Sequence, residues 1–151
     1  MKIKVGVTID APPEVVWQTV EQIERHVDWM ADAVSITFTT AAHRGEGTQF
    51  DCMTRIGPFR TNDRMTITQW TPRRAIGIKH QGVVTGWGRF ALGRRRGNST
   101  RFTWTERLRF PWWMGGRIGA LAAKPILRRV WRRNLATLKE IVEAQAPSSG
   151  G

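Results

Sequence analysis

Apolar and polar residues alternate along most of the first two thirds of the chain, and such alternation predicts β-strands. In the first run, KIKVGVTI at residues 2–9, every second residue from Ile3 to Ile9 is Ile or Val. Comparable runs occupy residues 34–38, 48–56, 59–70, 75–80, 83–92 and 99–110. Because these runs follow one another at hairpin spacing, they predict a seven-stranded antiparallel sheet.

Three segments have helical periodicity instead. Residues 10–20 and 21–30 predict two short helices directly after the first strand, and the prolines at 12–13 suit a helix start. From about Trp113 to Ala144 the apolar residues recur every three or four positions, which predicts one long amphipathic helix. Its apolar stripe consists of Ile118, Leu121, Ala122, Ile126, Leu127, Val130, Trp131, Leu135, Leu138, Ile141 and Val142. Pro125 predicts a kink or a break in this helix.

The length and composition indicate one globular domain. A chain of 151 residues with 40% apolar and 24% charged residues can bury a core of its own. With no linker or repeat in view, we predict a single domain at 1–144 and a flexible tail at 145–151. The chain shows no apolar leader and no run of ~20 apolar residues, so we expect a cytoplasmic protein.

The net charge of +12 is concentrated in the C-terminal part of the chain. Residues 1–88 contain 10 basic and 9 acidic residues, whereas residues 89–151 contain 14 basic and 3 acidic ones. Such a field attracts anions, which could be nucleic acid, acidic lipid headgroups or acidic partners. A solvated helix face with a basic hairpin turn is the simpler interpretation of the same pattern.

Metal and cofactor chemistry has little support in the sequence. The single cysteine, Cys52, excludes an internal disulfide, and on an apolar strand face it is expected to pack rather than to react. His26 and His43 are expected on a helix surface and in a loop, and no third ligand stands at a suitable spacing. We therefore expect no metal and no cofactor.

Several local motifs, in this order, resemble the START-like (SRPBCC) superfamily, which has the helix-grip fold of the birch pollen allergen. They are APPEVVW at 11–17, Trp29 before the second strand, GEGT at 45–48, WTPRRAIGIKHQG at 70–82 and FTWTE at 102–106. Within the superfamily the chain is most similar to the polyketide cyclase/dehydrase-like group of small bacterial proteins. The similarity extends over about residues 2–144.

The resemblance implies an α+β helix-grip fold, in which a seven-stranded antiparallel sheet curves around a long C-terminal helix and two short helices follow strand one. It also implies a cavity between sheet and helix that holds an apolar or amphipathic molecule. Many members have no known catalytic residue, and fold alone does not define chemistry. No catalytic role is therefore carried over from the family.

Strand phase indicates which residues face this space, because side chains alternate between the two faces of a strand. The candidate ligand-binding residues chosen in this way are Phe38, Phe50, Asp63, Met65, Ile67, Ile78, His80, Phe90, Trp104 and Glu106. The resemblance adds Trp113, because the start of the long helix forms the rim of the family's cavity. A mostly apolar wall with a few polar groups is typical of a ligand pocket.

Glu106 and His80 are the candidates for chemistry. Glu106 is a carboxylate on an apolar strand face, and if the two side chains meet, they form an acid–base pair suited to enolisation and dehydration. Two alternatives stay open. Glu106 could pair with an arginine for structural reasons, and His80 could be an ordinary strand-end residue.

Trp112 and Trp113 stand at the start of the long helix, among arginines and small residues. Because tryptophans are highly buried on average, we predict that both cap the core; contact with a membrane interface is the alternative.

Three functional hypotheses follow. The leading one is the binding of a small apolar or amphipathic molecule, either lipid-like or polyketide-like. The alternatives are a polyketide cyclase/dehydratase-type enzyme that uses Glu106 and His80, and a lipid carrier that docks to anionic membranes through its basic C-terminal part. Specific nucleic-acid binding is the weakest hypothesis, because no nucleic-acid-binding module is present.

Overall fold

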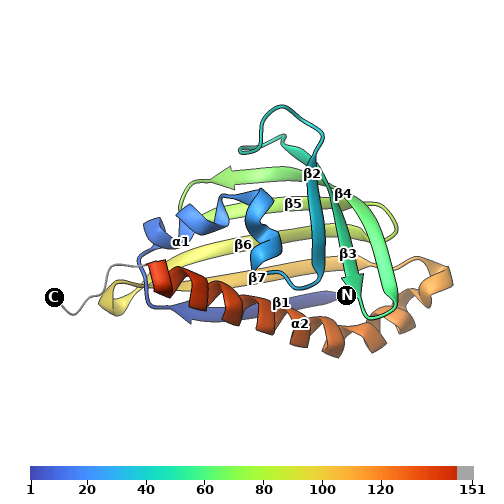
Figure 1. The fold of residues 1–151 in the computed structure, drawn as a ribbon. Coiled ribbons are helices and arrows are strands. Elements are labelled where there is room, and N and C mark those ends of the chain that lie inside the picture. The colour runs from blue at the N-terminus through green and yellow to red at the C-terminus, as the bar shows by residue number, and fades with distance from the viewer. Residues whose placement is uncertain (146–151) are drawn as a thin grey trace.

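The computed structural model describes residues 1–145, and its elements follow the predicted order (Figure 1). The strands are β1 (Lys2–Ile9), β2 (Ala33–Phe38), β3 (Gln49–Ile56), β4 (Phe59–Thr71), β5 (Ala75–Gln81), β6 (Thr85–Arg95) and β7 (Ser99–Arg109). The α-helices are α1 (Pro13–Val20) and α2 (Gly116–Gln145). Short 3-10 helices complete the chain: η1 (Ile23–Asp28), η2 (Arg96–Asn98) and η3 (Trp112–Met114). Of the predicted tail at 145–151, Gln145 is the last residue of α2, and residues 146–151 lie outside the described residues.

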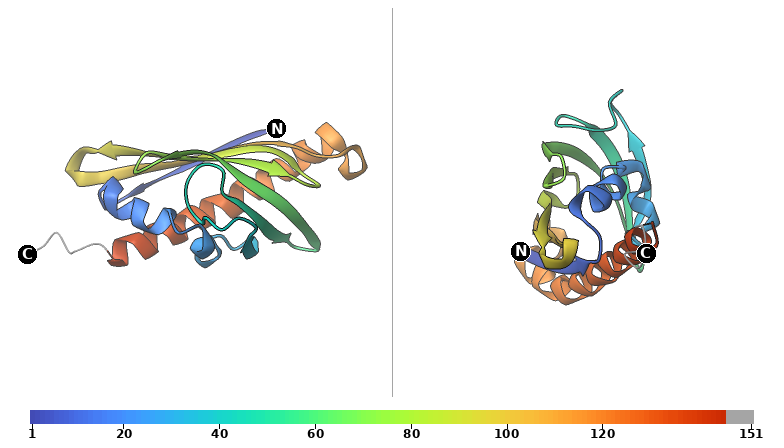
Figure 2. Two further views of the ribbon diagram at one scale, coloured as in Figure 1. Left: turned by 90° about the horizontal axis from the view of Figure 1, so that it is seen from above. Right: turned by 90° about the vertical axis from the view of Figure 1, so that its left-hand side faces the viewer.

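The seven strands form one antiparallel sheet in the order β1-β7-β6-β5-β4-β3-β2, as predicted. Consecutive hairpins build β2 to β7, and β1 closes the series by pairing with β7, which places Ile3 opposite Glu106. Irregularities in the register at Ala33/Ser35 and at Ile67/Gln69 increase the local bend of the strands. The sheet therefore curves, and α2 lies along its inner face (Figure 2).

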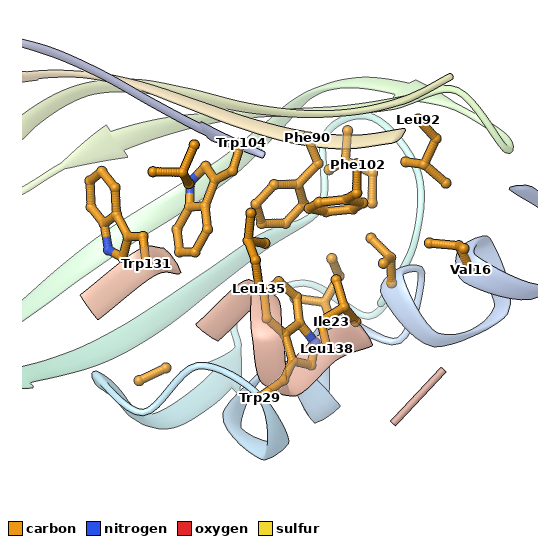
Figure 3. Packing of buried hydrophobic residues seen from close by; sticks show 14 of the residues in the cluster. Val16, Ile23, Trp29, Phe90, Leu92, Phe102, Trp104, Trp131, Leu135 and Leu138 are labelled. Atoms are coloured by element: carbon orange, nitrogen blue, oxygen red, sulfur yellow. The ribbon is translucent and has the colours of Figure 1, made fainter. Parts of the chain in front are cut away.

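The core lies between the inner face of the sheet and the C-terminal half of α2. Leu127, Trp131, Leu135, Leu138 and Val142 are buried there. Aromatic side chains from the sheet and from the end of η1 meet this stripe (Figure 3). The buried aromatic members of the cluster are Trp17, Trp29, Phe50, Phe90, Phe102, Trp104 and Trp131. Burial of these large side chains fixes the position of α2 on the sheet.

The N-terminal half of α2 differs from the prediction. Of the kink or break predicted at Pro125, the break does not occur, because Pro125 lies inside one continuous helix. Ile118, Leu121 and Ile126 were expected in the buried stripe but are 81%, 71% and 57% exposed. The reason is positional: α2 begins at the end of the strands, where the sheet no longer covers it (Figure 1).

The second short helix is a 3-10 helix, and it brings a histidine into the core. His26 was expected at a helix surface, but its side chain is buried and its ring lies 5.1 Å from that of Trp29 and 5.8 Å from that of Phe90. The expectation was wrong because η1 packs against the inner face of the sheet.

No helix within residues 1–145 is long and apolar enough to cross a membrane.

Candidate functional site

The two residues chosen for chemistry form a pair on the inner face of the sheet. Glu106 belongs to β7 and His80 belongs to β5, and the His80 Nε2 lies 2.9 Å from the Glu106 Oε2. Both side chains are largely buried, with 15% of His80 and 8% of Glu106 exposed. The interaction spans strand β6, which lies between the two strands that carry the pair.

Glycines in β6 make this reach possible. Gly88 stands between Ile78 on one side and Glu106 on the other in the register of the sheet. A Cβ at position 88 would lie 2.6 Å from the Glu106 Cδ, so any larger residue would displace the carboxylate. Gly86, on the same strand as Gly88, pairs with His80 of β5 in the register of the sheet. The carboxylate therefore crosses β6 over a position that has no side chain.

Trp104 binds the other oxygen of the carboxylate. Its Nε1 donates a hydrogen bond of 2.9 Å to the Glu106 Oε1. Both oxygens of Glu106 thus have a partner, one from the indole and one from the imidazole. A carboxylate buried in this way keeps its hydrogen bonds and its counter-charge, which makes its burial tolerable.

The environment of His80 favours its charged form. Burial alone would lower the pKa of His80, but the charge and hydrogen bond of Glu106 and the charge of Asp63 together raise it above the ordinary 6.5. Asp63 lies on β4, is 5% exposed, and accepts a hydrogen bond of 3.0 Å from the Val83 backbone N–H. The Glu106 carboxylate and the charge of Asp63 therefore favour the protonated form of the His80 imidazole.

A second polar group, the half-buried Asp32, was missed by sequence reasoning and lies on the other side of Trp104. Asp32 accepts hydrogen bonds from the Asn134 Nδ2 at 2.7 Å and from the Trp131 Nε1 at 3.4 Å. Burial raises the pKa of Asp32, and the nearby charge of Glu106 raises it further against the effect of these hydrogen bonds. The Asn134 Oδ1 also accepts a 3.0 Å hydrogen bond from the Ala31 N–H.

Two stacked indoles connect these groups. The rings of Trp104 and Trp131 lie 4.9 Å apart at 23°, and each indole donates to a different carboxylate, Glu106 or Asp32. Trp131 reaches the sheet from α2 (Figure 3). The only sequence signal for this group was Trp131 in the helical stripe; Asp32 follows η1 in a short loop, so no periodicity marked it.

Most of the other candidate residues lie on the inner face as the strand phase predicted. Phe50, Asp63, Met65, Ile67, Phe90 and Trp104 are buried, whereas Phe38 and Ile78 are half-buried. The inner face therefore has two parts. Helix α2 packs mainly on β1 and β7. Farther along the sheet, Ile78 on β5 and Phe38 on β2 are half-buried, and Ile78 lies two residues before His80 on the same face of β5.

The tryptophans at the start of α2 do not belong to this site. Trp112 is 85% exposed and Trp113 is 61% exposed, so the prediction that both cap the core was wrong. Pro111 and Gly115 turn the chain sharply at η3 and leave both indoles outside the packed layers. Trp113 is therefore a surface residue, and sequence reasoning could not foresee this because burial statistics favour the core.

Two open hollows lie on the surface. One, of about 630 Å³, is at the β5–β6 hairpin and is lined by Thr68, Lys79, His80, Gln81, Gly82, Thr85, Gly86 and Trp87. The other, of about 490 Å³, lies on α2 and is lined by Pro125, Arg128, Arg129, Arg132, Arg133 and Ala136. His80, one member of the His80–Glu106 pair, is among the residues that line the first hollow.

Cys52 and His43, the other candidates for reactivity, show no arrangement that would activate them. Burial raises the pKa of the Cys52 thiol to about 11, which leaves it protonated and unreactive at neutral pH. His43 stacks on Phe38 with ring centroids 3.9 Å apart. Within residues 1–145, no group of three or more His, Cys, Asp or Glu side chains is arranged to hold a metal ion.

A curved antiparallel sheet that grips one long helix defines a protein of the START-like, helix-grip class. The sequence matches the family model described as "Polyketide cyclase / dehydrase and lipid transport" over residues 1–143, and the chain belongs to this family. No curated protein matches the sequence.

Solved structures share the fold at low sequence identity. TTHA0849 from Thermus thermophilus superposes with a TM-score of 0.79 at 16% identity, covering 97% of this chain and 100% of that one. The Zhui aromatase/cyclase from a Streptomyces species gives 0.70 at 17% identity, with coverage of 100% and 98%. Ara h 8.0201 gives 0.66 at 11% identity, with coverage of 95% and 98%. At these identities the likeness shows the fold alone.

Proposed function

We propose that this protein binds a small apolar or amphipathic molecule on the inner face of its sheet, with the His80–Glu106 pair as the polar anchor. The observation that carries the proposal is the buried pair itself, at 2.9 Å, set beside half-buried apolar side chains. A mostly apolar surface with one well-placed polar group is the usual composition of a small-molecule site. The family description, which includes lipid transport, supports the same class of ligand.

The pair also defines the polar group that the ligand would carry. Both oxygens of Glu106 already accept hydrogen bonds, and the Nε2 of His80 is engaged with Glu106. The free group of the pair is the Nδ1–H of the protonated imidazole, which is a donor. The matching ligand group is a hydrogen-bond acceptor such as a ketone, carboxylate or sulfonate oxygen.

The alternative, a cyclase or dehydratase that uses Glu106 and His80, rests on the same residues. A structural neighbour is an aromatase/cyclase, and the family description includes polyketide cyclase and dehydrase. His80 is suited to donate a proton to a carbonyl oxygen. Both oxygens of Glu106 have partners, however, so no free carboxylate oxygen remains as the base, and we rank binding first.

The test compares Glu106→Gln with Thr105→Ala, which changes the outward-facing neighbour on the same strand. The probe is 8-anilinonaphthalene-1-sulfonate, an aromatic molecule with acceptor oxygens, followed by fluorescence titration. We expect Glu106→Gln to weaken binding about tenfold, because loss of the carboxylate charge disfavours the protonated His80 that donates to the ligand, and a hydrogen bond from a charged group contributes about 1.5–3 kcal/mol. Thr105→Ala should bind as the unchanged protein does.

The pH dependence of binding gives a second readout. Because the pKa of His80 is raised, its donor is present at low pH and is lost as the pH rises through that pKa. Affinity should fall along the same curve, and Glu106→Gln should shift the midpoint to lower pH. If Glu106→Gln lowers only the melting temperature while affinity and its pH midpoint stay unchanged, the pair is structural and the proposal is wrong.

A further inference from the structure

The start of α2 and the preceding η3 present an apolar surface to solvent. Five large side chains there are exposed by more than half: Trp112 at 85%, Trp113 at 61%, Ile118 at 81%, Leu121 at 71% and Ile126 at 57%. Scattered exposed apolar residues are ordinary, but five within fifteen residues of sequence form a concentrated group. This surface therefore needs a physical explanation.

Helical spacing joins this apolar surface to a basic one. Ile118, Leu121 and Ile126 face outward, and Arg129, Arg132 and Arg133 continue the same exposed side. The opposite side of the helix holds the buried stripe from Leu127 to Val142. The outer side of α2 thus changes from apolar to basic along its length.

The charge of this region has a single sign. Residues 107–139 contain nine Lys or Arg residues and no Asp or Glu. The hollow of about 490 Å³ on α2 is lined by Arg128, Arg129, Arg132 and Arg133 together with Pro125 and Ala136. The Nε of Arg128 is buried and has no hydrogen-bond acceptor within residues 1–145. The three exposed arginines of this hollow, Arg129, Arg132 and Arg133, are suited to bind an anionic oxygen such as that of a phosphate.

We propose that the outer face of η3 and of α2 as far as Arg133 docks onto an anionic lipid bilayer. The indoles and aliphatic side chains would enter the interface, where an amphipathic helix buries its apolar face about 5–10 Å deep. The arginines would bind lipid phosphates, and each basic residue near such a surface contributes about fivefold to affinity. The inference goes beyond the ligand site and does not depend on it.

A soluble polyanion explains the surface less well. Arginines alone would serve nucleic acid, but the large aliphatic side chains Ile118, Leu121 and Ile126 have no role on a phosphate backbone. The outer face of the sheet offers a useful contrast. It carries Lys2, Lys4 and Lys79 with the exposed Trp87, but no comparable aliphatic group. This makes the outer face of the sheet the natural control.

The test is sedimentation with vesicles of phosphatidylcholine, with and without phosphatidylserine. The full chain should bind the anionic vesicles at low ionic strength, bind neutral ones weakly, and release as salt is added. The double variant Trp112→Ala/Trp113→Ala should weaken binding about tenfold or more, because two interfacial anchors are removed. Trp87→Ala, which removes an exposed tryptophan from the outer face of the sheet, should have no effect.

Matched charge variants test the contribution of the exposed arginines of α2. Arg129→Gln/Arg132→Gln/Arg133→Gln should weaken binding and reduce its salt dependence, whereas Lys2→Gln/Lys4→Gln/Lys79→Gln removes the same charge and should change binding much less. Arg128→Gln reports on the hollow, and inorganic phosphate as a competitor separates a free anion from a headgroup. All of these residues apart from Arg128 are exposed, so circular dichroism and thermal melting should confirm that the variants fold.

Three outcomes would overturn the proposal. The first is no binding to anionic vesicles at low salt. The second is a general polycation effect. It would appear as an equal loss of binding in the triple lysine variant and the triple arginine variant, or as no loss of binding in the double tryptophan variant. The third is self-association of the unchanged protein that the double tryptophan variant abolishes, which would assign the surface to a second copy. Probe binding on the inner face should be unchanged in every variant, which keeps this test separate from that of the ligand site.

Discussion

Two buried histidines in this chain have opposite protonation behaviour because their neighbours differ. His80 has Glu106 and Asp63 around it, and their charges raise its pKa. His26 lies among aromatic rings with one strong hydrogen bond, from its Nε2 to the Val20 carbonyl at 2.7 Å. Burial lowers the pKa of His26 to about 4 despite that bond and the charge of Glu24.

The environment of His26 predicts sensitivity to acid. The unfolded chain takes up a proton on this residue near pH 6.5 and the folded chain only near 4, so stability is fully present above 6.5 and is lost as the pH falls toward 4. A shift of this size corresponds to roughly 3 kcal/mol. Urea unfolding across this range should show that His26→Gln loses less stability on acidification than the unchanged protein.

The matched control is His43→Gln, which alters an exposed histidine stacked on Phe38. It should keep the acid sensitivity of the unchanged protein. If His26→Gln and His43→Gln follow the same pH curve, then His26 does not govern the acid response.

For single residues, the sequence predicted which face of the sheet a side chain occupies but not which side chains meet. Strand alternation placed Glu106 and His80 on the inner face, because one strand residue in two must face it. Their contact depends on two strands that are separated by a third, and only the register of the folded sheet determines it. Asp32 gave no signal, since it lies in a loop where no periodicity applies.

Among the elements, β6 determines whether the polar pair exists. Its Gly88 lies beneath the Glu106 carboxylate, where a Cβ would come within 2.6 Å of the Glu106 Cδ. The glycines of this strand are visible in the sequence. Only the folded sheet shows that Gly88 leaves room for the side chain of Glu106 on the neighbouring strand.

Gly88→Ala should therefore disrupt the pair without altering either of its members. The carboxylate must move away from His80, so we expect probe affinity to fall about as much as in Glu106→Gln, by about tenfold. Gly93→Ala on the same strand is the control, because a Cβ there meets nothing within 4 Å. Fluorescence titration of both variants, with thermal melting alongside, checks this. Equal affinity in the two variants would contradict the role given to Gly88.

Helix α2 shows why an amphipathic pattern does not define what a helix faces. Its periodicity predicted one apolar stripe, but the large apolar side chains of the helix are buried only from Leu127 onward, with Ala120 as the one buried residue before it. Ile118, Leu121 and Ile126 fit the same periodicity and face water, because the helix starts beyond the end of the strands. Periodicity predicts a helix; it carries no information about where the opposing surface ends.

At the scale of the whole molecule, charge and ligand chemistry occupy different surfaces. The His80–Glu106 pair lies on the inner face of the sheet, while the arginines of α2 and the exposed tryptophans of η3 point outward. The excess of positive charge in residues 89–151 therefore lies mainly on the surface and not in the site.

This separation predicts that the two proposed activities are independent. Glu106→Gln should sediment with anionic vesicles as the unchanged protein does, and Trp112→Ala/Trp113→Ala should bind the fluorescent probe with unchanged affinity. Measuring both variants in both assays completes the comparison. A variant that loses both activities while still folded would show that the two surfaces are coupled, and the independence would have to be given up.

The sequence by itself determined the order of elements, the antiparallel sheet, the family resemblance and the inward phase of the site residues. These follow from local periodicity and from motifs, which are properties of neighbouring residues. Tertiary structure alone decided the contact of Glu106 with His80, the burial of His26, the Asp32 cluster and the exposure of Trp112 and Trp113. Each of these depends on which distant segments meet, and a one-dimensional pattern does not contain that information.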